Sequence, residues 1–118
     1  MTVLAVACAG ALGALCRYAI SLAVGPLGFP WATLGVNVSG SFLLGLLYAV
    51  APVPDGMLKV AVGTGFLGAF TTFSTFSVET VGLIRGDRPV LAVVYATLSV
   101  VLGIVAASAG LLLGQRAT

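Results

Sequence analysis

Four long apolar stretches, separated by short turn-forming segments, make up almost the whole chain. They cover residues 2–24, 31–50, 57–84 and 90–113, and each is long enough for a helix that crosses a bilayer, which needs about 20 residues. Proline and glycine, which end helices, are concentrated in the segments between them. Asp55 in the second of these segments is placed to cap the third helix. The pattern predicts an all-α integral membrane protein with four transmembrane helices, forming a single transmembrane domain over residues 1–118.

The third stretch differs from the others because polar residues and glycine interrupt its middle. Glycine is a poor helix former, and Ser and Thr side chains compete for backbone hydrogen bonds, so we expect this helix to break or unwind there. Non-helical backbone at membrane depth is tolerated only where it is buried in protein or lines a wet cavity. The stretch is therefore either a packing interface or a permeation site. Its interrupting residues are Gly68, Thr71, Thr72, Ser74, Thr75 and Ser77.

Other helices also carry polar side chains at membrane depth. Arg17 and Glu79 lie at similar depths from one membrane face, so we expect them to form an ion pair, although Arg17 could instead snorkel to the interface or attract an anion. Asn37 is either an interhelical hydrogen-bonding residue or a ligand of a permeating species. Tyr95 and Ser99, one turn apart on the last helix, are either a hydroxyl track beside a pore or ordinary interhelical contacts.

The composition excludes most other classes of protein. Hydrophobic residues make up 60% of the chain and charged residues 7%, with a mean hydropathy of +1.23, which leaves no room for a soluble domain. The chain has no His, and Cys8 and Cys16 lie together on the first helix, so the sequence does not predict an enzyme. It contains no nucleotide-binding loop and no basic patch for nucleic acid.

Basic residues are balanced between the two sides of the predicted membrane domain. Lys59 and Arg116 fall on one side, and Arg85 and Arg88 fall on the other. The positive-inside rule needs an imbalance to fix an orientation, so the sequence is nearly indifferent to which way it inserts. Subunits that insert both ways can pair antiparallel about an axis in the membrane plane.

Three segments of the sequence resemble the signature blocks of the bacterial fluoride channels, the CrcB/Fluc family. They are GALGALCRY (10–18), TLGVNVSGSFLLG (33–45) and GFLGAFTTFSTFSVE (65–79). The resemblance covers the whole chain in order. It implies an antiparallel, dual-topology homodimer in the bacterial inner membrane, with two pores that passively export fluoride from the cytoplasm.

The resemblance also implies roles for individual residues. Sodium would be a structural ion at the dimer axis, bound by the backbone carbonyls of Gly68 and Thr71 from both subunits. One departure is Gly103, where some relatives carry a further hydroxyl. Arg17 and Glu79 would be vestibule or structural charges. The residues implied to line the fluoride pore are Thr33, Asn37, Phe73, Ser74, Thr75, Phe76, Tyr95 and Ser99.

The chemistry of these residues suits fluoride. A small, strongly hydrated anion needs hydrogen-bond donors that replace its water, which Asn, Ser and Thr supply. Phe73 and Phe76, three residues apart on one helical face, could present the positive edges of their rings to an anion. The rival hypotheses are a small dual-topology multidrug or cation exporter and a non-transporting assembly subunit. The exporter needs a carboxylate in the first helix, which this sequence lacks.

Overall fold

The computed structural model describes residues 1–51 and 56–118, and the expected cap at Asp55 lies outside the described residues. The described part is helical, without strands, and includes four helical spans long and apolar enough to cross a membrane. The elements are α1 (Thr2–Val24), α2 (Trp31–Val50), α3 (Met57–Val60), the π-helical segment η1 (Ala61–Leu67), α4 (Gly68–Phe70), α5 (Phe73–Arg85) and α6 (Pro89–Ala117). The third span is therefore the series from α3 to α5, with a break after Phe70.

The helix bounds in the structure lie within one residue of the predicted ones, except at the end of the last helix. The first two helices have the predicted ends, and the third span ends one residue later than predicted, at Arg85. The last helix begins at Pro89, a position that suits proline because its missing N–H has no helical partner there. It continues past the expected end at residue 113 because Gly114 packs against Ala49 of α2 instead of ending the helix.

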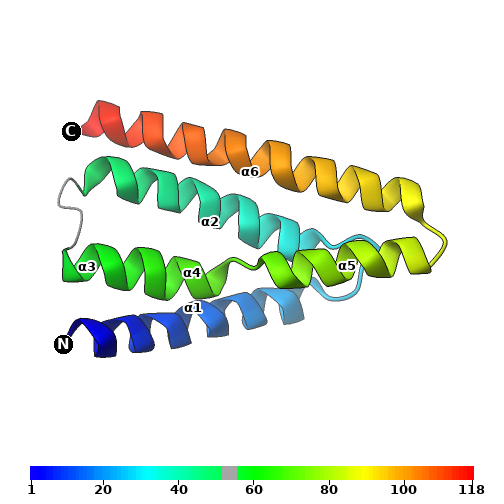
Figure 1. Cartoon of the computed structure of the whole chain (residues 1–118), viewed down its shortest axis with the longest axis horizontal. Helices are drawn as coiled ribbons and strands as arrows, with labels where there is room; N and C mark the ends of the chain where they lie inside the picture. Colours follow the sequence, from blue (N-terminus) through cyan, green and yellow to red (C-terminus); the bar gives the residue numbers. More distant parts are fainter. Residues whose placement is uncertain (52–55) are drawn as a thin grey trace.

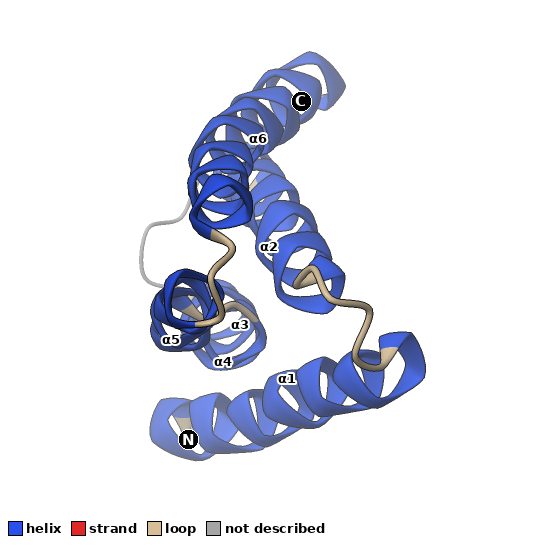
Figure 2. Ribbon diagram, turned by 90° about the vertical axis from the view of Figure 1, so that its right-hand side faces the viewer, coloured by secondary structure: helices blue, strands red, loops and turns tan. Residues whose placement is uncertain are grey.

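The helices run back and forth along the long axis of a molecule measuring 47 × 31 × 20 Å, and both termini lie at the same end (Figure 1). Seen along that axis, α1 and α6 lie on opposite sides of the third span (Figure 2). The closest packing is between α2 and α6, where Gly45 and Gly110 bring the two backbones together. On the other side, Gly13 of α1 and Gly65 of η1 allow α1 to approach the third span.

The buried core lies where α2, α5 and α6 meet. Leu34, Leu83, Ala92 and Tyr95 are buried there, and Phe29 from the loop before α2 packs against them. Many large apolar side chains elsewhere are exposed, particularly on α1 and α6. Such surfaces suit helices surrounded by lipid or by a second membrane subunit.

Candidate functional site at the helix break

The third span is interrupted at Thr71 and Thr72, as the sequence predicts. Both residues have extended backbone, with φ/ψ of −79°/157° and −153°/120°. The Thr72 hydroxyl then caps α5 by accepting a hydrogen bond of 3.2 Å from the Thr75 backbone N–H. The Thr71 hydroxyl instead donates to the Leu67 carbonyl in the preceding turn. The two threonines thus end one helical segment and begin the next.

Asn37 of α2 holds the break in place from the neighbouring helix. Its amide nitrogen donates to the Thr72 carbonyl at 3.0 Å, and its amide oxygen accepts from the Thr72 N–H at 2.8 Å. The side chain therefore pairs with both the N–H and the C=O of one residue, as a neighbouring β-strand would. An amide group carries two N–H donors, so this pairing uses one of them. The interhelical role of Asn37 is present in the structure, and its second amide hydrogen is left over from the pairing.

The pairing of the Asn37 side chain with Thr72 also removes the helical hydrogen-bond donors of two backbone carbonyls. In a continuous helix, the Thr72 N–H would donate to Gly68 and the Thr75 N–H would donate to Thr71. Here these donors are directed to the Asn37 amide oxygen and the Thr72 hydroxyl. The carbonyls of Gly68 and Thr71 therefore lose their ordinary helical donors at the middle of the membrane span.

A groove runs beside the break. Its volume is about 280 Å³, and its wall is mostly apolar, with polar side chains from α2 and from the interruption itself. Ser41, one turn after Asn37, also lines it, although the sequence reasoning did not select this residue. Ser41 could have been found from its four-residue spacing from Asn37, which places both side chains on one face of α2. The predicted residues that the groove brings together are Asn37, Gly68, Thr71, Thr72 and Phe73.

The two phenylalanines lie next to each other but in different surroundings. Their ring centroids are 5.6 Å apart, as expected for side chains three residues apart on one helix face. Phe73 is 79% exposed in the single subunit. Phe76 is partly buried and packs against Tyr95, with ring centroids 5.2 Å apart. Phe73 is thus available to a partner or an ion, whereas Phe76 belongs partly to the core.

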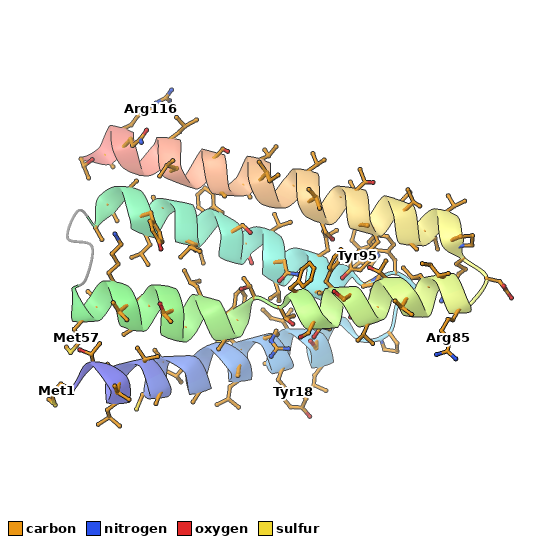
Figure 3. The ribbon with its side chains drawn as sticks, in the orientation of Figure 1. Met1, Tyr18, Met57, Arg85, Tyr95 and Arg116 are labelled. Atoms are coloured by element: carbon orange, nitrogen blue, oxygen red, sulfur yellow. The ribbon has the colours of Figure 1, made fainter. Side chains whose placement is uncertain are left out.

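Glu79 lies in a separate polar cluster further along α5. Its carboxylate oxygens accept hydrogen bonds from the Thr33 hydroxyl at 2.9 Å and the Tyr95 hydroxyl at 2.7 Å. Tyr95 is fully buried between the helices (Figure 3), where Phe29 meets its ring edge-on. Of the two roles considered for Tyr95, the structure shows the interhelical one. The part played by Phe29 was not recognised from the sequence because Phe29 lies in a turn.

The expected ion pair between Arg17 and Glu79 is wrong for this subunit. Across residues 1–51 and 56–118, the structure shows no ion pair joining the two. The Arg17 Nε instead donates to the Ala69 carbonyl at 3.3 Å, in the last turn of α4, where carbonyls lack helical partners. Spacing predicted their depth, but it did not predict that α1 packs against η1 and α4 while Glu79 faces α2 and α6.

The remaining predicted residues, Ser74, Thr75 and Ser99, carry hydroxyl groups. Ser74 and Thr75 both approach the Thr72 hydroxyl, at 3.3 and 3.1 Å, so three hydroxyl groups gather at the start of α5. Ser99 on α6 is different, because its hydroxyl oxygen is buried and has no hydrogen-bond partner among the described residues. A buried hydroxyl without a partner is uncommon and marks a position where a ligand or water can bind.

A sequence model of the family described as "CrcB-like protein, Camphor Resistance (CrcB)" matches residues 4–111. A protein of Deinococcus radiodurans named "Fluoride-specific ion channel FluC" is 52% identical over 113 residues, which are 91% of this chain and 90% of that protein. A protein of the same name from Saccharophagus degradans is 48% identical over 96% of this chain and 89% of its own length. Another, from Magnetococcus marinus, is 48% identical over 93% of this chain and 94% of its own length. These names describe ion channels, and none describes an enzyme or a multidrug exporter. With matches over nearly its full length, the chain belongs to the CrcB-like family.

Proposed function

We propose that this protein is a fluoride-selective channel that lets fluoride leave the bacterial cytoplasm passively. The observation that carries the proposal is the pairing of the Asn37 amide with the backbone of Thr72, which holds the interrupted helix beside a groove that has Asn37, Ser41 and Thr71 in its wall. The relatives named fluoride-specific channels support the choice of ion. The exporter alternative has no support, because α1 carries no carboxylate and the relatives bear another name.

The side chains at the groove favour a small anion over a cation. The second amide hydrogen of Asn37 and the hydroxyl of Ser41 can donate to an ion in the groove, and donors repel cations. Ser41 currently donates to the Asn37 carbonyl at 2.7 Å, so it would rotate to serve an ion. Ring edges of Phe73 and Phe76 add a positive quadrupole contribution beside them. The path would continue along Ser99, whose buried hydroxyl lacks a partner in the described residues.

The functional unit in this proposal is an antiparallel homodimer with two pores. The groove is open on one side, and Phe73 at its edge is largely exposed, so a single subunit does not enclose a path. The balance of Lys59 and Arg116 against Arg85 and Arg88 gives neither orientation an advantage. Two oppositely inserted copies would bring two helix breaks together near the membrane centre.

A structural sodium ion fits the same region. The carbonyls of Gly68 and Thr71 have lost their helical donors, and carbonyl oxygens are the hard ligands that small hard cations prefer. Both residues line the groove. With each subunit supplying two such oxygens, the dimer would offer sodium a fixed site, where the ion would supply positive charge that holds the two breaks together.

Arg17 and Glu79 have different roles in this proposal. Arg17 holds the end of α4 and places a positive charge near the break, where it would attract fluoride. Glu79 is structural, because Thr33 and Tyr95 already bond both of its oxygens and thereby join α2, α5 and α6.

The direct test is efflux from liposomes that contain the purified protein. Vesicles loaded with potassium fluoride should release fluoride when a potassium ionophore removes the opposing voltage, and vesicles loaded with potassium chloride should release almost no chloride. Equal release of both anions would contradict selectivity. Fluoride release that stops without a proton gradient would contradict a passive channel.

A further inference from the structure

Lys59 is held in a defined position at the membrane end that carries the chain termini. Its ammonium group donates to the Ala51 carbonyl at 2.9 Å, just after the end of α2. The same nitrogen lies 4.7 Å from the centroid of the Tyr48 ring, a cation–π distance. The side chain is half-buried between α2 and α3. Its charge is therefore fixed in place and does not sample the open interface as a surface lysine does.

A cavity lies beside this ammonium group. It has a volume of about 230 Å³ and is lined by Lys59, Tyr48 and Thr64 together with Leu44 and Gly63. Among the described cavities, a basic side chain also lines the one beside Arg88, where Glu79 lies in the same wall, whereas no carboxylate of the described residues lines the cavity beside Lys59. A fixed positive charge in a low-dielectric wall raises the local concentration of anions.

The cavity lies next to the groove at the helix break, because Leu44 and Gly63, on α2 and η1, line both of them. Twelve residues separate Lys59 from Thr71, which is roughly 18 Å along a helix. That length is about half of a hydrocarbon core of roughly 30 Å. The cavity and the groove therefore lie one after the other between the end of the molecule that carries the termini and the depth of the break.

We propose that Lys59 is an anion-recruiting residue at the mouth of this path, where it concentrates fluoride before the ion reaches the groove beside Asn37. This inference rests on the proposed function. The Tyr48 ring and the Ala51 carbonyl hold the ammonium group at the mouth. Because fluoride would be attracted without being held by rigid ligands, it can move on toward the break.

The test compares fluoride efflux at low and high ionic strength, about 10 mM and about 300 mM, because screening removes steering at high salt. Lys59→Gln should lower the initial rate by about tenfold at low salt and little at high salt. Lys59→Arg should retain the rate. Thr64→Asp, which places a negative charge in the same cavity and so cancels the charge of Lys59, should lower it in the same salt-dependent way.

Arg116→Gln is the matched control, since Arg116 is an exposed cation at the same end that points away from the helices (Figure 3) and should not change the rate. If Lys59 only caps α2, Lys59→Gln would lower the melting temperature and leave the rate per dimer equal to that of the unmodified protein at both ionic strengths. That result, or an unchanged rate in Thr64→Asp, would overturn the inference. Absence of fluoride efflux from the unmodified protein would overturn the proposed function as well.

Discussion

At the scale of single residues, the helix break depends on one side-chain amide. Asn37 satisfies both polar groups of the Thr72 peptide, which would otherwise be exposed to lipid or to an apolar interior. A side chain that only donates or only accepts could not do this. The identity of the residue at position 37 is therefore determined by the break as well as by any ion that passes.

Replacing Asn37 with Asp should impair both fluoride flux and stability. Asp cannot donate to the Thr72 carbonyl, and its charge would face that carbonyl oxygen and repel fluoride. Losing a buried bond of this kind costs about 1–3 kcal/mol of stability. If the charge raises the barrier for fluoride by about 1.4 kcal/mol or more, fluoride efflux falls about tenfold or more.

Efflux and thermal unfolding of Asn37→Asp should be measured beside Ser39→Ala. Ser39 lies on the same helix, is exposed, and donates only to carbonyls of its own helix, so its loss should change neither quantity. Efflux from Asn37→Asp equal to that of the unmodified protein would place the fluoride path elsewhere.

The two phenylalanines should respond differently to replacement with Ile. Both changes remove a positive ring edge, so both should reduce fluoride flux. Only Phe76→Ile should also lower the melting temperature, because Phe76 packs against buried Tyr95 whereas Phe73 is 79% exposed. Efflux and thermal unfolding measured on both variants separate these effects. Normal efflux in both variants would mean that the ring edges do not face the ion.

At the scale of the helices, the sequence predicted that the third span would break near its middle, but it did not predict the residues at which it breaks or the contacts that hold the break. Glycine and hydroxyl-bearing residues indicated the interruption, and the length of the apolar stretches indicated the four membrane-spanning helices. The π-helical segment η1 and the position of the break at Thr71 and Thr72 depend on contacts with α1 and α2, which local composition does not contain. The predicted ion pair between Arg17 and Glu79 was wrong for the same reason. Spacing along the sequence gives the depth of a residue in the membrane, but it does not give the neighbouring helix that the side chain faces.

The cap at the start of α5 gives a prediction at this scale. Thr72→Ala removes the hydroxyl that accepts from the Thr75 N–H and should cost about 0.5–2 kcal/mol of stability. Thr72→Ser keeps a capping oxygen and should be nearly neutral. Thermal unfolding in detergent checks both variants. Equal stability of the Ala and Ser variants would show that the cap does not hold the segment.

At the scale of the whole molecule, the subunit is incomplete as a pore. Its groove is open, many of its large apolar side chains are exposed, and few of them are buried. The basic residues at its two ends are balanced, as the proposed insertion in both orientations requires. These features all favour assembly with an oppositely oriented copy.

Locking the orientation should therefore abolish activity. Two or three Lys residues added to the turn at 86–88 should hold every copy in one orientation, and such a copy expressed alone should not conduct fluoride. A second copy, locked in the opposite orientation by Lys residues added near Arg116, should restore efflux when the two are expressed together. Full efflux from one locked form alone would refute antiparallel assembly.

The most direct measurement of the central claim is the current through the purified protein in a planar bilayer with unequal fluoride concentrations and equal chloride concentrations on the two sides. A passive fluoride channel predicts a current that reverses at the fluoride equilibrium potential and is unchanged by a pH difference. A reversal potential at zero, or one that follows the proton gradient, would contradict the account.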